Sequence, residues 1–197
     1  MQTIFVLISA LTMLIRPVNE KPQEPEITVY KTYEDFSQKK GQDYDTYLSA
    51  NSLGTKVTLV FIHKGDKVKV KCGDIWGFRY RDALYRTDTN YEMPVKLISY
   101  GRLCYYENGP AHLAMMKNGT NTAEFGIGAF CYASVDLRSE IFQFSGKKSD
   151  GKKAREHFIA VDPIYAEYFD CLGFPGNNVP ASHRKCVEQF QAAHPLK

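Results

Sequence analysis

The residues with the clearest chemical potential lie near the C-terminus. His183 and Cys186 are three positions apart, which places both on one face of a predicted helix, and Cys171 precedes them across a turn-rich loop. Three such side chains can ligate zinc. A structural zinc site, however, takes four ligands in close pairs such as C-x-x-C, and the chain has no such pattern here. We therefore predict no metal, a disulfide between Cys171 and Cys186, and a surface His183.

A Cys–His nucleophile is a second possibility. The other cysteines lie in apolar or strand-like segments, where a thiol is most often a small buried hydrophobic group: Cys72, Cys104 and Cys131. Nucleophilic catalysis needs a base within hydrogen-bond reach and a third group that orients it. His63, His112 and His157 lie on or beside predicted strands, but no spacing places one of them against a thiol. We interpret the three thiols as buried.

Other motifs point to no catalyst and no cofactor. The carboxylate pairs Glu34–Asp35 and Glu167–Asp170 fall on predicted helices, where capping and solvation explain them. The glycines of FGIGAF (residues 125–130) lack the strand–turn–helix context of a dinucleotide site.

Basic residues form the remaining candidate site. Lys67, Lys69 and Lys71 alternate along a predicted strand and share one face of it. A second group follows in the segment 146–157: Lys147, Lys148, Lys152, Lys153 and Arg155. Together they can form a basic face for an anionic glycan, a lipid headgroup or an acidic partner. The alternative is a solvated loop and an edge strand whose lysines prevent aggregation. A net charge of +3 is too small to indicate nucleic acid.

The first half of the chain predicts strands with one short helix. Residues 27–30 form a short strand, and Thr32 with Asp35 makes a capping-box pattern for a helix from Tyr33 to about Lys40, ended by Gly41. Residues 42–55 are polar and poorly patterned, which predicts a loop. The β-branched segment from Val57 continues through a Gly65-Asp66 turn into the alternating KVKVKC, which predicts a hairpin.

Further strands follow at short intervals. Single strands are expected in residues 74–80, 83–87 and 140–144, and Gly77 marks a bulge or a close approach of two backbones in the first of them. Residues 95–107 are expected to form a strand pair or one strand bent at Gly101. Residues 112–135 are expected to form a hairpin. Strands joined by turns this short pair antiparallel.

The C-terminal part has helical signals. KKAREHFIAV (residues 152–161) can start a helix after a basic, loop-like stretch. Asp162-Pro163 predicts a helix that ends at Gly173, and Pro180 opens another with an apolar stripe of Cys186, Val187, Phe190 and Ala193. The expected fold is α+β and β-rich: a curved antiparallel sheet or partly open barrel followed by a C-terminal helical pair.

The N-terminus predicts export. Residues 4–15 (IFVLISALTMLI) are apolar but too few for a membrane-spanning helix, which needs ~20 residues. They fit the core of a signal peptide, which we place at residues 1–20, with a linker at 21–26 and one domain at 27–197. The alternative is an uncleaved anchor or a buried N-terminal helix. Composition is ordinary, with 44% hydrophobic and 24% charged residues, so a folded domain is expected.

One segment carries a resemblance. KVKVKCGDIWGFRYRDALYRT followed by ISYGRLCYYE combines a basic alternating strand, an Asp-x-Trp-Gly-aromatic step and a Gly-x-Leu-Cys-x-Tyr strand. With the leading YKTYEDF, it resembles uncharacterised exported bacterial β-rich proteins over about residues 30–135. The resemblance implies an exported β domain and no particular activity.

These observations favour an exported protein, periplasmic, cell-surface or secreted, that acts as a non-enzymatic binding or structural module. Its expected partner is an anionic envelope or glycan surface or another protein. The alternative is an exported hydrolase of glycans or peptides, with a His and a carboxylate or thiol brought together by folding. A deep pocket lined by such groups would favour the hydrolase, and a basic or aromatic patch would favour binding.

Overall fold

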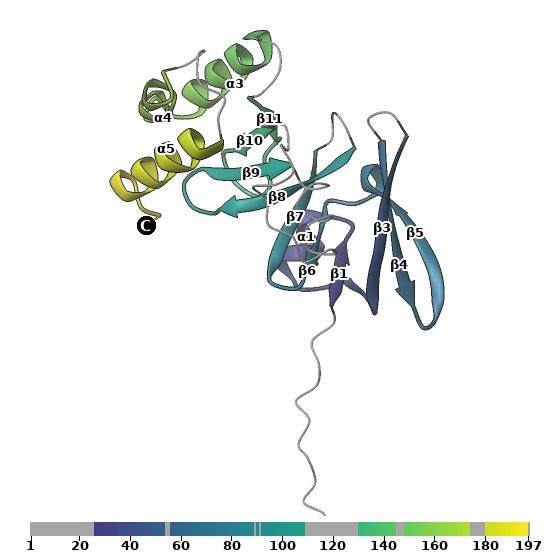
Figure 1. Cartoon of the computed structure of the whole chain (residues 1–197). Helices are drawn as coiled ribbons and strands as arrows, with labels where there is room; N and C mark the ends of the chain where they lie inside the picture. The colour runs from purple at the N-terminus through teal and green to yellow at the C-terminus, as the bar shows by residue number, and fades with distance from the viewer. Residues whose placement is uncertain are drawn as a thin grey trace, which may run out of the picture.

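The computed structural model describes residues 26–53, 56–88, 90, 92–108, 130–144, 148–173 and 180–196. The predicted signal peptide, and the linker apart from Glu26, lie outside these residues, as does most of the hairpin expected over 112–135. The described part is an α+β fold with two antiparallel sheets, one short N-terminal helix and three C-terminal helices (Figure 1).

The larger sheet has eight strands among the described residues, and every neighbouring pair is antiparallel. In pairing order they are β11 (Phe142–Gln143), β10 (Cys131–Ser134), β9 (Cys104–Asn108), β8 (Met93–Ser99), β7 (Ala83–Asp88), β6 (Gly77–Tyr80), β1 (Ile27–Tyr30) and β2 (Gln42–Tyr44). The smaller sheet is β3 (Thr46–Leu53), β4 (Lys56–His63) and β5 (Asp66–Lys71), followed by the 3-10 turn η1 (Cys72–Asp74). The helices are α1 (Tyr33–Ser37), α3 (Lys148–Val161), α4 (Tyr165–Cys171) and α5 (Pro180–Ala193).

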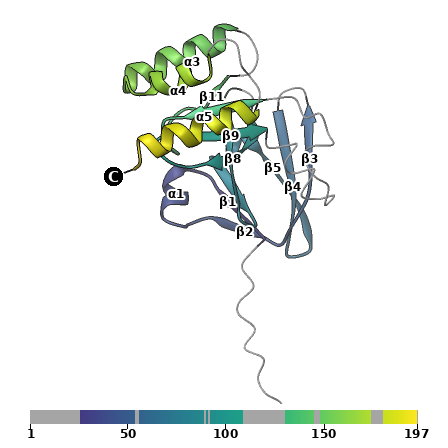
Figure 2. The same cartoon turned by 60° about the vertical axis from the view of Figure 1, so that its left-hand side comes forward.

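Two apolar clusters pack on one face of the large sheet. The small sheet packs on the β1–β6–β7 end, where Phe61 contacts Phe78 at a ring distance of 6.3 Å and Tyr47 contacts Tyr80 at 5.4 Å. The C-terminal helices pack on the β9–β10 end through Phe158, Tyr168, Phe169, Val187 and Phe190. Figure 2 shows α5 lying across β9 and β8. Burial of this much aromatic surface is the main stabilising term of the fold.

The opposite face of the large sheet carries α1 and the segment 135–141. Leu137 and Ile141 join a third apolar cluster with Val95, Tyr106 and Tyr132. Arg86 is buried there against the rings of Trp76 and Tyr106, and its Nη1 donates to the carbonyl oxygen of Ser139 at 3.0 Å. The sheet is therefore covered on both faces, but α1 covers only the β1–β2 end of this second face (Figure 2).

The fold class and most elements are as predicted. The 95–107 segment is a strand pair, β8 and β9. At Gly77 the backbone approaches that of Tyr85 closely, because a Cβ at Gly77 would lie 2.3 Å from the carbonyl oxygen of Tyr85. The large sheet is not closed, which agrees with the predicted fold class, and the basic stretch before residue 158 is helical, so that α3 precedes the predicted pair.

Two local predictions are wrong. Residues 42–55 were expected to be a loop, but β2 and the whole of β3 lie there, with β3 paired to β4 from Thr46–Ile62 to Leu53–Lys56. An edge strand with one solvated side needs few apolar residues, so its pattern is weak. Ala193 does not extend the buried stripe of α5, because it lies exposed in the last turn. No helix in the described ranges is both long and apolar enough to cross a membrane.

Candidate functional site

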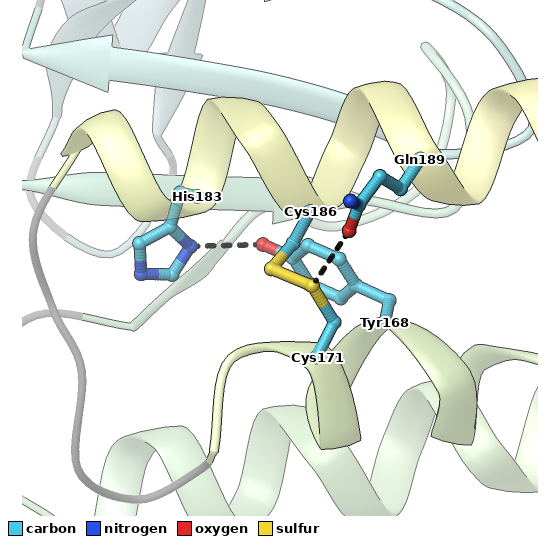
Figure 3. Close-up of a disulfide and its surroundings, with 5 residues drawn as sticks. All are labelled: Tyr168, Cys171, His183, Cys186 and Gln189. Atoms are coloured by element: carbon cyan, nitrogen blue, oxygen red, sulfur yellow. Dashed lines mark hydrogen bonds between the residues drawn. A yellow bond between two sulfur atoms is a disulfide. The ribbon is translucent and has the colours of Figure 1, made fainter.

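The predicted disulfide is present between α4 and α5. The Sγ atoms of Cys171 and Cys186 are 2.07 Å apart and their Cα atoms 5.8 Å apart (Figure 3). The side-chain amide of Gln189 lies beside the bridge, with Oε1 at 3.3 Å from Sγ of Cys171. The cross-link fixes the two helices that cover the β9–β10 end of the sheet.

The surface position expected for His183 is wrong. Its side chain is fully buried, with Nδ1 2.9 Å from the hydroxyl oxygen of Tyr168, as Figure 3 shows. The ring also stacks on Tyr105 and Phe144. His183 lies four residues before Val187, so it continues the buried face of α5 by one turn. With Cys186 in the disulfide, the zinc set is not assembled, and the described residues contain no group of three or more potential metal ligands.

The remaining thiols are buried, as predicted. Burial raises the pKa of the Cys72 thiol to about 12 and those of Cys104 and Cys131 to about 11. Since the thiolate is the nucleophile, these thiols are unreactive at neutral pH. Sγ of Cys131 accepts a hydrogen bond from the hydroxyl of Tyr105 at 3.3 Å, and a tyrosine with a strongly raised pKa is no general base.

The structure separates the two groups of basic residues. Lys67, Lys69 and Lys71 lie on β5 with exposed side chains, while the valines between them are half-buried, as the alternation predicts. The second group belongs to α3, which lies apart from β5 in both views (Figures 1 and 2). There Lys152 pairs with Glu156 at 3.7 Å and Arg155 with Asp170 at 3.6 Å, while Lys153 is exposed. Lys147 and the side chain of Lys148 lie outside the described part of the chain.

A different basic site is formed beside α1. Its pocket of ≈ 590 Å³ is lined by Thr28, Tyr30, Phe36, Ser37, Lys39, Arg79 and Arg81. The alternation of side chains along β1 and β6 brings the strand residues of this lining together. On one face, Ile27, Val29 and Phe78 point toward the small sheet. Thr28, Tyr30 and Arg79 therefore point to the opposite face. Phe36 of α1 covers Tyr30 edge-on, with ring centroids 5.3 Å apart.

The three cations of this pocket differ in their partners. Arg81 is held by Glu26, whose Oε1 accepts from Nε at 3.3 Å and from Nη2 at 3.1 Å. Among the described residues, Arg79 and Lys39 have no ion pair and no side-chain hydrogen bond, although Arg79 lies between Thr28 of β1 and Leu84 of β7 in the sheet. Burial raises the pKa of the Tyr30 phenol; nearby Arg79 lowers it and nearby Asp43 raises it, and the net rise keeps Tyr30 a neutral donor at physiological pH.

The backbone of α1 places Lys39 at the pocket. The capping box is as predicted: Thr32 accepts from the N–H of Asp35 at 3.0 Å, and the Asp35 side chain accepts from the N–H of Thr32. The helix ends earlier than expected, in a Schellman motif. The N–H of Lys39 donates to the carbonyl oxygen of Phe36 at 3.1 Å, and that of Lys40 to Asp35 at 2.8 Å.

Lys39 therefore occupies the position that glycine usually takes. Its φ is +56°, and a left-handed residue other than glycine costs about 1 kcal/mol. Gly41, which was expected to end the helix, serves another purpose: a Cβ there would lie 2.2 Å from Cγ2 of Thr28. Because glycine has no Cβ, the chain can enter β2 beside β1 without a clash at this position.

A second pocket, of ≈ 400 Å³, lies between β11, the start of α3 and Asn90. It mixes Glu140, Asp150 and Lys153, with no histidine or thiol in its lining. Its two carboxylates against one ammonium make it unsuited to an anion.

Sequence reasoning missed the pocket beside α1. Arg79 lies on a strand that was predicted, so its face could be inferred in the same way as that of the β5 lysines, whereas Arg81 lies in the turn after β6. No pattern in the sequence could place Lys39 in this pocket. Its position depends on where α1 ends and on the strand β2, which was expected to be a loop.

No family of proteins, curated protein or solved structure matches this chain. The resemblance of residues 30–135 to exported bacterial β-rich proteins thus stays a prediction.

Proposed function

We propose that this chain is an exported, non-enzymatic binding module that attaches to anionic groups of the cell envelope or of a glycan. The observation that carries the proposal is the pocket beside α1. It gathers three basic side chains, and two of them, Lys39 and Arg79, have no ion pair among the described residues. Basic groups held together without counter-charges attract and retain anions.

The lining of the pocket favours binding over catalysis. It contains hydroxyls, an aromatic ring and cations, and no histidine, thiol or carboxylate to act as nucleophile or base. Elsewhere in the described residues, the free thiols are buried with raised pKa values and the carboxylate pair Glu167 and Asp170 is bound to His194 and Arg155.

Two features support export. Residues 4–15 have the length and composition of a signal-peptide core. The Cys171–Cys186 bridge belongs to an oxidising compartment, since disulfides persist outside the reducing cytosol.

The test has two parts. The oxidised chain without residues 1–20 is applied to a dextran sulfate resin and to an uncharged dextran control, with a salt gradient. We expect retention on the sulfated resin that disappears as salt rises, because salt screens exposed charges. Retention on both resins, or on neither, would refute anion binding. Separately, the full chain is expressed in its host and fractionated; a cytoplasmic chain that still starts at Met1 would refute export.

A further inference from the structure

We infer that the anion site is the pocket beside α1, and not the lysine face of β5, and that it takes a phosphate or sulfate ester on a sugar-sized ligand. This inference rests on the proposed function and adds the location and the ligand class. Four features of the pocket support it: its charge, its donors, its size and its backbone.

The charge of the pocket suits a compact oxyanion. Its lining carries Lys39, Arg79 and Arg81, and the carboxylate that directly pairs with this set is Glu26, bound to Arg81. Asp43 accepts a hydrogen bond from Thr28 of the lining at 2.8 Å, so three cations stand against two nearby carboxylates and one excess positive charge remains. The lysines of β5, in contrast, are spread along one exposed face of a strand. The pocket favours anion binding because its three cations surround one concave space, where a single anion can meet all of them.

The donors fit several oxygens at once. Arg79 offers a planar guanidinium from a central strand, which suits the paired oxygens of a phosphate or sulfate. Tyr30 keeps its proton and can donate, while Ser37, whose hydroxyl donates to the carbonyl oxygen of Glu34 at 2.9 Å, can accept from a ligand hydroxyl. A ligand with both an oxyanion and hydroxyl groups uses all of them.

The size of the pocket leaves room for a ligand larger than a bare ion. A volume of ≈ 590 Å³ lies in the range of small-molecule pockets, about 300–1,000 Å³. Phe36 supplies an apolar wall, held edge-on by Tyr30 and tilted against Trp76 at 4.6 Å. A sugar ring can pack its C–H face on this wall while its ester group reaches the cations.

The backbone of Lys39 is unfavourable for its residue type. Four non-glycine residues in the described ranges have positive φ: Lys39, Lys64, Arg81 and Glu92. Two of them, Lys39 and Arg81, line this one pocket. Glycine would fit the Lys39 backbone better, and strained residues of this kind cluster at ligand-binding sites. Lysine at position 39 therefore costs stability relative to glycine and places an ammonium at the pocket.

The experiment compares stability with affinity. Glucose 6-phosphate, glucose 6-sulfate, glucose and inorganic phosphate are titrated into the chain by calorimetry at low salt. We expect one of the two esters to bind at least about tenfold tighter than glucose and inorganic phosphate, and the stronger ester identifies the group. Equal affinity for inorganic phosphate and both esters would overturn the sugar-sized ligand.

The variants test the location. Lys39→Gly is expected to raise the melting temperature and to weaken ester binding about tenfold, as is expected for one lost charged contact. Lys64→Gly is the matched control: it has a similar φ of +51° in the β4–β5 turn, so it should also gain stability but bind normally. Arg79→Gln removes a second cation from an exposed position and should weaken binding without unfolding the chain.

Opposite results separate this inference from the proposed function. If Lys67→Gln, Lys69→Gln and Lys71→Gln together abolish salt-sensitive retention while Lys39→Gly and Arg79→Gln leave it intact, the pocket assignment is wrong and the binding module stands. If the unmodified chain shows no salt-sensitive retention, the proposed function itself fails.

Discussion

The Cys171–Cys186 bridge provides a quantitative test of the C-terminal half of the fold. Cys171→Ala removes the cross-link at its exposed end and leaves the buried Cys186 in place. The bridge closes a loop with a sequence separation of 15. In the chain-entropy account, the loss of such a loop lowers the free energy of unfolding by about 3 kcal/mol. For a domain of this size, this corresponds to a decrease in Tm of roughly 6–12 °C.

The assay is thermal unfolding followed by circular dichroism, with and without reductant. The unmodified chain should lose the same 6–12 °C, roughly, when it is reduced, and Cys171→Ala should not respond to reductant. This comparison separates the cross-link from the side chain. A Tm of the oxidised variant within about 2 °C of the unmodified chain would refute the reasoning, because α4 and α5 would then be held by packing alone.

Three further predictions concern single features. The free thiols, with pKa values raised to about 11–12, should not react with Ellman's reagent at pH 8 in the native chain, and three should react after unfolding; rapid native labelling would contradict their burial. Thr32→Ala should lower the free energy of unfolding in urea by about 1 kcal/mol, since the cap of α1 is lost, and an unchanged midpoint would contradict that role. Asp136 is partly desolvated, which raises its pKa, but hydrogen bonds from Ser139 and Arg138 outweigh this and hold the pKa below its usual value of 3.8. Its contribution to stability is thus complete above the unfolded pKa and is lost as the pH falls below 3.8, so Asp136→Asn should flatten the acid side of the stability curve; identical slopes for the two chains would refute this.

Much of the fold could be predicted because its strands bury one side. The alternation in Lys67–Lys71 and the β-branched segment from Val57 repeat with period two, which only a strand places on one face. The Cys171–Cys186 pair followed from two helices joined by a turn-rich loop. In an edge strand such as β3, few residues are apolar, so the alternation of apolar and polar residues is weak and the strand was not predicted.

The candidate site could not be predicted, because it depends on long-range pairing and on one unusual residue. Arg79 lies in the pocket only because β6 pairs with β1, about 50 residues earlier in the chain, and such pairing carries no local signal. Lys39 adopts a conformation that its residue type disfavours, so propensity pointed instead to Gly41. His183 was misplaced for a related reason: its burial depends on Tyr168, a partner 15 residues away that hydrogen-bonds with Nδ1.

The most direct test of the central claim is an NMR titration of the uniformly ¹⁵N-labelled, oxidised chain with glucose 6-phosphate and glucose 6-sulfate, with glucose as control. We predict that the esters shift the amide signals of Ser37, Lys39, Arg79 and Arg81 in a saturable manner, and that signals from β5 do not move. Shifts confined to residues 67–71, or identical shifts with glucose, would contradict the account.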